Sequence, residues 1–144
     1  MPAGKGRGIS VIFGFGSCVA QVAEVAVGKD GRVRVERVCA IDCGTIVNPD
    51  AVRAQAEGGA IFGITAALHG EITLENGRAT QTNFDNWQML RIDEAPAIEV
   101  YLVDSTKAPE GMGEPATACI APAVVNAVFA AKSACGGCRS TAPN

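Results

Sequence analysis

The residues best suited to chemistry lie in the segment Gly111-Met112-Gly113-Glu114-Pro115. Gly113 lets a bulky neighbour approach the backbone, and Pro115 disfavours the helical conformation at Glu114. The apolar stretch 116–125 follows, so we expect the Glu114 carboxylate to be partly desolvated. A carboxylate in such surroundings suits general-base catalysis. The competing interpretation is a surface glutamate in a glycine–proline turn.

A second candidate is Gln55, in the run Gln55-Ala56-Glu57-Gly58-Gly59. We expect Gln55 near the N-terminus of a helix, where backbone N–H groups favour polar and anionic groups. Its side-chain amide offers both hydrogen-bond donors and an acceptor, so it could bind a polar cofactor that the glycines allow to approach. The alternative is a solvated glutamine on an amphipathic helix.

The helix that carries Gln55 has clear boundaries in the sequence. Asn48 can cap the N-terminus, Pro49 suits the first helical position, and Gly70 marks the end. Three glycines inside the helix (Gly58, Gly59 and Gly63) each cost about 1 kcal/mol relative to alanine. We therefore expect the close approach of another backbone or of a ligand.

The other expected elements make this an α+β chain. Alternating apolar residues and turn sequences predict two β-hairpins, a further strand, a loop and a second main helix. In chain order these are strands 18–27 and 32–41 around the turn 28–31, the helix 49–69, strands 71–75 and 78–83 around Asn76-Gly77, strand 97–104, loop 105–119, and a helix from Pro122 to about Lys132.

Composition narrows the class of protein. The chain has 144 residues, of which 48% are hydrophobic, and this suits one folded domain or a fragment of one. The net charge of −3 argues against nucleic acid as a partner, because a phosphate backbone requires a basic patch. We find no apolar run approaching the roughly 18–20 residues that span a bilayer.

The six cysteines fall into two groups. Four lie among small apolar residues and are interpreted as buried hydrophobic side chains: Cys18, Cys39, Cys43 and Cys119. The other two, Cys135 and Cys138, form a C-x-x-C motif that could be a redox or zinc site. Cys39 and Cys43 could complete four zinc ligands, but their spacing is typical of strand residues.

Three motifs together resemble the xanthine dehydrogenase/aldehyde oxidase family: 41–49 (Ile-Asp-Cys-Gly-Thr-Ile-Val-Asn-Pro), 55–63 (Gln-Ala-Glu-Gly-Gly-Ala-Ile-Phe-Gly) and 111–115. The segments 14–25 and Asn83-Phe84 are similar to the isoquinoline 1-oxidoreductase beta-subunit branch. The resemblance covers residues 6–132 and corresponds to the C-terminal part of the molybdopterin-binding large subunit.

The resemblance implies a function as well as a fold. The cofactor would be a molybdenum–molybdopterin cytosine dinucleotide, with Gln55 and Gly113 at the cofactor and no metal ligand from the protein. Glu114 would be the general base in hydroxylation of an N-heterocycle or aldehyde, with water as the oxygen source. Expected partners are the remainder of the large subunit, a small [2Fe-2S] subunit and an electron acceptor such as a cytochrome. The compartment stays open between bacterial cytoplasm and periplasm.

The chain also departs from the family pattern. It is several times shorter than the family subunit, so we expect the isolated fragment to be inactive. Residues 133–144 lack apolar periodicity, and we expect a disordered tail or the product of a frameshift near residue 132. Two alternatives remain, namely a non-catalytic assembly module and a small thiol or zinc protein that uses Cys135 and Cys138.

Overall fold

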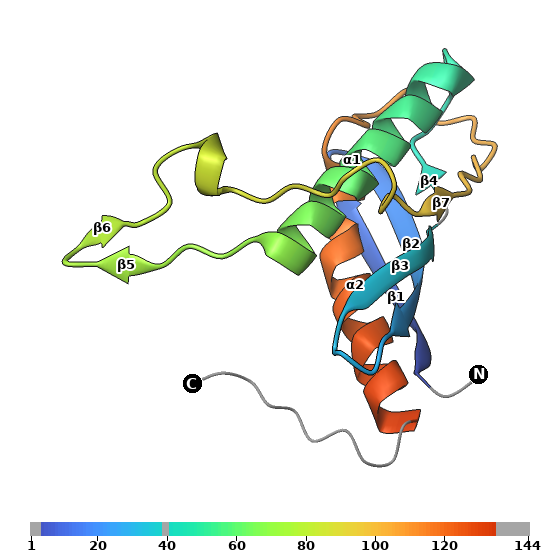
Figure 1. Cartoon of the computed structure of the whole chain (residues 1–144). Coiled ribbons are helices and arrows are strands. Elements are labelled where there is room, and N and C mark those ends of the chain that lie inside the picture. Colours follow the sequence, from blue (N-terminus) through green and yellow to red (C-terminus); the bar gives the residue numbers. More distant parts are fainter. Residues whose placement is uncertain (1–3, 39–40, 135–144) are drawn as a thin grey trace.

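The computed structural model describes residues 4–38 and 41–134. Within them, a five-stranded sheet is covered by two long helices (Figure 1). The sheet has the strand order β1-β2-β3-β7, and β4 also pairs with β2. Its elements are β1 (Lys5–Gly14), β2 (Ser17–Val27), β3 (Val33–Val38), β4 (Ile41–Asp42), β7 (Ala97–Ile98), α1 (Pro49–His69) and α2 (Pro115–Ala134). The α+β prediction is confirmed.

The sheet places α2 directly against β1. The two strands of the β1–β2 hairpin are antiparallel in continuous register from Lys5↔Ala26 to Gly14↔Ser17. A Cβ at Gly6 or Gly8 would collide with the backbone of α2 near Ala127, so these glycines allow helix and strand to touch. The sequence did not predict β1, because glycine is depleted in strands; here the close packing offsets that penalty.

Helix α1 begins and ends where its sequence predicts. Asn48 Oδ1 accepts hydrogen bonds from the backbone N–H groups of Asp50 and Ala51, each at 3.1 Å. Gly70 donates its N–H to the Ala66 carbonyl at 3.0 Å and closes the last turn. These contacts satisfy backbone groups that a bare helix end leaves unpaired.

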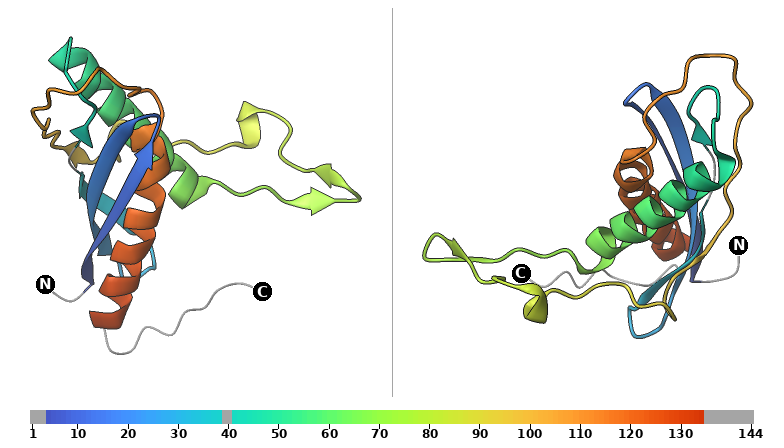
Figure 2. Two further views of the ribbon diagram at one scale, coloured as in Figure 1. Left: turned by 180° about the vertical axis from the view of Figure 1, so that it is seen from behind. Right: turned by 90° about the horizontal axis from the view of Figure 1, so that it is seen from above.

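The glycines of α1 have different surroundings. A Cβ on Gly63 would collide with Ile120 and the backbone of Thr117, and one on Gly59 would press on Thr117 and Ala116. These two glycines therefore allow α1 and α2 to cross closely, as Figure 2 shows. Gly58 faces open space, with nothing within 4 Å of an added Cβ. The expected approach of another backbone thus holds for two of the three glycines.

Helix α2 begins at Pro115, where we expected a loop that lasted to Cys119. Proline suits the first turn of a helix, and Pro122 lies inside the helix rather than at its start. The lost hydrogen bond at Pro122 is offset because α2 packs against β1, β2 and α1. By length and composition α2 is also apolar enough to span a bilayer, contrary to our expectation, and one face of it packs on the sheet.

Most residues between α1 and β7 form an arm that extends away from the sheet (Figures 1 and 2), and the chain returns to α1 at Leu90, whose N–H donates to Thr65 Oγ1 at 3.3 Å. The predicted hairpin is present but short, with β5 (Leu74–Glu75) paired to β6 (Arg78–Ala79), followed by the 3-10 turn η1 (Phe84–Asn86). The arm leaves apolar side chains exposed, including Phe84 at 84% and Ile92 at 95%. The predicted strand 97–104 is likewise reduced to β7 and a single bridge between Ile41 and Leu102.

The structure describes only part of the last predicted segment, residues 133–144. Ser133 and Ala134 are the last residues of α2. Residues 135–144 lie outside the described part of the chain. The domain boundaries 6–132 and 133–144 therefore stay predictions.

Candidate functional site

Glu114 lies at the start of α2. Its carbonyl oxygen accepts hydrogen bonds from the N–H groups of Thr117 at 3.0 Å and Ala118 at 3.3 Å, which begin the helix. Pro115 and Ala116 are buried beneath it, but the Glu114 side chain is exposed. The expectation of a partly desolvated carboxylate is thus wrong for this chain taken alone, because nothing in the described residues covers it.

Gln55 lies beside the segment that carries Glu114. A Cβ placed on Gly113 would be 3.8 Å from Gln55 Nε2, so the two residues are in van der Waals range. Gln55 and Glu114 are both exposed. The helical spacing puts Gly58 on the same face of α1 as Gln55, and the space over Gly58 is open. The structure therefore places Gly113, the residue before Glu114, beside Gln55.

The segment before Glu114 is held by the loop after β4. The backbone N–H of Thr45 donates to the Lys107 carbonyl at 3.0 Å, and Thr45 Oγ1 donates to the same oxygen at 2.6 Å. The Glu110 N–H donates to the Cys43 carbonyl at 3.1 Å. A Cβ on Gly44, whose φ is +75°, would collide with the Ala108 carbonyl. The motif 41–49 thus acts as a support for the segment that carries Glu114.

A second support was missed in the sequence analysis. The turn between β1 and β2 contacts Gly111, which donates its N–H to the Phe15 carbonyl at 3.1 Å and accepts from Ser17 Oγ at 2.6 Å. Ser17 is fully buried. The available signal was the run Gly14-Phe15-Gly16-Ser17, a turn sequence that we used only for family resemblance.

A small core lies under the site. Met112 is buried between the two supports, and its cluster joins residues from β2, β4, α1 and α2: Val19, Ile41, Cys43, Ala56, Ala116 and Cys119. Burial raises the pKa of the Cys43 thiol, and the negative charge of Asp42 raises it further. Cys43 and Cys119 behave as small apolar side chains, as predicted, whereas Cys18 is exposed.

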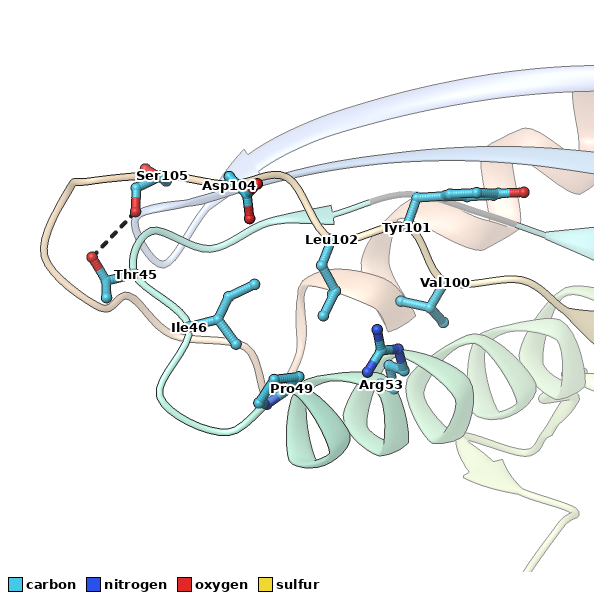
Figure 3. Close-up of a pocket in the computed structure, with 9 residues that line it drawn as sticks. All are labelled: Thr45, Ile46, Pro49, Arg53, Val100, Tyr101, Leu102, Asp104 and Ser105. Atoms are coloured by element: carbon cyan, nitrogen blue, oxygen red, sulfur yellow. Dashed lines mark hydrogen bonds between the residues drawn. The ribbon is translucent and has the colours of Figure 1, made fainter.

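A cavity of about 630 Å³ opens at the start of α1, and Figure 3 shows the residues around it. Arg53 reaches from α1 toward Val100 and Leu102, and Thr45 is hydrogen-bonded to the Ser105 carbonyl across the rim. Neither Gln55 nor Glu114 lines this cavity. The cavity and the candidate site are therefore separate.

No group of three or more His, Cys, Asp or Glu side chains is placed to hold a metal ion within residues 4–38 and 41–134. Cys39, Cys135 and Cys138 lie outside the described residues. The zinc and thiol alternative, and the expectation of no protein metal ligand, both stay untested.

The described residues thus form an α+β unit in which Gly113, next to Glu114, lies beside Gln55. Residues 3–96 match the family described as the molybdopterin cofactor-binding domain. This match spans more than half of the 144-residue chain. The chain belongs to the molybdopterin cofactor-binding domain family, which occurs in molybdenum-dependent oxidoreductases.

Three similar proteins and structures sharpen this assignment. The chain is 39% identical over 76% of its length to isoquinoline 1-oxidoreductase subunit beta of Brevundimonas diminuta, and covers 14% of that protein. It is 35% identical over 88% of its length to a membrane-bound aldehyde dehydrogenase of Gluconacetobacter polyoxogenes, whose name specifies pyrroloquinoline quinone, and covers 16% of that protein. The crystal structure of quinoline 2-oxidoreductase from Pseudomonas putida 86 aligns with a TM-score of 0.74 at 26% identity, over 81% of this chain and 16% of that one.

The resemblance to the isoquinoline 1-oxidoreductase branch is thus confirmed as similarity. The chain spans less than a fifth of the length of these relatives. It therefore corresponds to one piece of such a subunit.

Proposed function

We propose that this chain is part of the large subunit of a molybdenum hydroxylase, with Glu114 as the general base. The substrate would be an N-heterocycle or an aldehyde, and water would supply the oxygen. The observation that carries the proposal is that Gly113, the residue before Glu114, lies beside Gln55 in a chain that belongs to the molybdopterin cofactor-binding family. Names of similar proteins that specify isoquinoline, quinoline and aldehydes support the substrate class.

The residues on this surface fit a polar cofactor. The Gln55 amide provides donors and an acceptor, and the bare backbone at Gly113 and Gly58 leaves room for a ligand. Gln55 and Gly113 would hold the molybdopterin, in its cytosine dinucleotide form, along one side. When bound, the cofactor would supply the two-electron oxidation of the substrate.

Glu114 would accept a proton on a carboxylate oxygen as the water-derived nucleophile attacks an electron-poor carbon. A positioned general base contributes roughly 10²–10⁴ to a rate. Its exposure in this chain fits the proposal if the remainder of the large subunit covers the site, since excluding water strengthens such electrostatic effects. The isolated chain would then be inactive. Electrons would leave through a small [2Fe-2S] subunit to an acceptor such as a cytochrome.

The test is the substitution Glu114→Gln in the complete large subunit, purified with its partner subunit. We expect unchanged molybdenum content and a loss of hydroxylation of isoquinoline, quinoline or aldehyde of about 10²–10⁴-fold. The matched control is Glu57→Gln, which removes another exposed carboxylate, on α1 two residues from Gln55; it should keep full activity.

A fully active Glu114→Gln enzyme would remove the base assignment and favour a non-catalytic assembly module. Purification of the complete subunit with pyrroloquinoline quinone and without molybdenum would instead overturn the cofactor.

A further inference from the structure

The Glu114 carboxylate has no hydrogen bond to another side chain or backbone group in the described part of the chain, and it is exposed. Its place is therefore set by the backbone on either side. On the C-terminal side, Pro115 is buried at the start of α2. On the N-terminal side, the fixed points nearest in sequence are Met112, which is 9% exposed, and Gly111.

Gly111 is bound through both of its backbone groups. Its N–H donates to the Phe15 carbonyl at 3.1 Å, and its carbonyl accepts from Ser17 Oγ at 2.6 Å. A Cβ on Gly111 would lie 3.1 Å from Phe15 Cβ, so a side chain at this position would push the two segments apart. The β1–β2 turn thus binds Gly111, which lies three positions before Glu114.

The turn has an unusual conformation for its sequence. Phe15 has a φ of 57° and Gly16 a φ of 81°. A bulky residue rarely adopts a positive φ, and such positions persist when surrounding contacts impose them. At Phe15 the bond from Gly111 is one such contact. The Glu110 side chain lies over Gly16, where a Cβ would collide with it.

We propose that Ser17, with the Phe15 carbonyl, is a positioning residue that fixes the segment 111–113 and so the place of the Glu114 carboxylate. This inference rests on the proposed function for its catalytic part. Ser17 is 0% exposed, and its hydroxyl bonds to the Gly111 carbonyl. Removal of the hydroxyl would leave that carbonyl without its partner and allow the segment to open.

The first experiment uses this chain as it is and does not depend on activity. Amide hydrogen exchange of Ser17→Ala is measured by NMR and compared with the unmodified chain. We expect exchange of the Gly111 amide, which is hydrogen-bonded to the Phe15 carbonyl, to be about tenfold faster, because one lost hydrogen bond shifts a local opening equilibrium by about that factor. Protection in α1 should stay unchanged and shows that the chain is folded.

The matched control is Thr65→Val. Thr65 is 3% exposed, and its hydroxyl donates to the Ile61 carbonyl at 3.0 Å, far along α1 from the site. This variant should leave exchange of the Gly111 amide unchanged. Unchanged exchange of that amide in Ser17→Ala, or faster exchange spread evenly over the whole fold, would overturn the proposal.

The second experiment separates this proposal from the proposed function. In the complete subunit, Ser17→Ala should lower kcat about ten- to a hundredfold with little change in KM, because a displaced base affects the transition state more than substrate binding. A fully active Ser17→Ala enzyme beside an inactive Glu114→Gln enzyme would refute the role of Ser17 and leave the role of Glu114 standing. An active Glu114→Gln enzyme would refute the base itself.

Discussion

Two hairpins in this chain close with the same kind of turn and yet differ in the length and burial of their strands. In the β1–β2 hairpin, Phe15 and Gly16 have φ values of 57° and 81°; in the β5–β6 hairpin, Asn76 and Gly77 have values of 50° and 77°. Positive φ at both central residues is typical of two-residue hairpin turns. The strands of the first are 10 and 11 residues long, and those of the second are two residues each.

The difference comes from what covers the strands. One face of β1 and β2 packs against α2, whereas all four residues of β5 and β6 are exposed. A two-stranded hairpin without a covering layer is at best marginally stable in water. A turn sequence therefore predicts where a chain reverses, and packing decides how far the strands extend from that point.

The largest effect should follow from weakening the layer that covers β1 and β2. Ile120 on α2 is 0% exposed in the main core. We expect Ile120→Ala to lower the free energy of unfolding by about 2–5 kcal/mol, measured by urea denaturation. Phe129→Ala is the control on the same helix, because Phe129 is 72% exposed and its loss should cost little. Equal effects of the two variants would mean that α2 is not docked as described.

A smaller effect should come from the glycines at the helix crossing. Gly63→Ala would push a methyl group into Ile120 and the backbone of Thr117, and should cost about 1–3 kcal/mol of unfolding free energy. Gly58→Ala meets open space and should instead add up to about 1 kcal/mol through helix propensity. Thermal denaturation of the two variants measures the expected loss of stability in Gly63→Ala and the expected gain in Gly58→Ala. The description of the crossing would be wrong if Gly63→Ala were as stable as Gly58→Ala.

The smallest effect is expected in the arm. Phe84 is 84% exposed, so Phe84→Ala should change the unfolding free energy of the isolated chain by no more than about 0.5 kcal/mol. The same denaturation measurement applies. A loss comparable to that of Ile120→Ala would show that the arm packs on the sheet, and the contrast between the two hairpins would disappear.

The features that the sequence predicted are those with local causes. The bounds of α1 depend on Asn48, Pro49 and Gly70, whose effects lie within one helical turn. The turn at Asn76-Gly77 is equally local. Strand β1 was missed because it is stabilised by packing against α2, which lies more than a hundred residues later in the sequence. The start of α2 was misplaced because Pro122 looked like a first-turn proline.

The site follows the same rule. The motif 111–115 identified Glu114, and the run at 55–59 identified Gln55, so the participants could be named in advance. Their proximity through Gly113 is a tertiary fact that the family resemblance anticipated and residue chemistry alone did not. The exposure of Glu114 could not be predicted, because it depends on which distant segments pack over the start of α2. The role of Ser17 depends on contact with a residue 94 positions away.

The direct contact between β1 and α2 also affects how the chain is made. During synthesis, β1 and its glycines emerge before the helix that covers them, which is translated about a hundred residues later. At roughly 5–20 residues per second, β1 stays uncovered by α2 for about 5–20 s. The nascent chain must therefore depend on slow, long-range closure, and β1 is where it would be most open to chaperone binding or to mispairing with another chain.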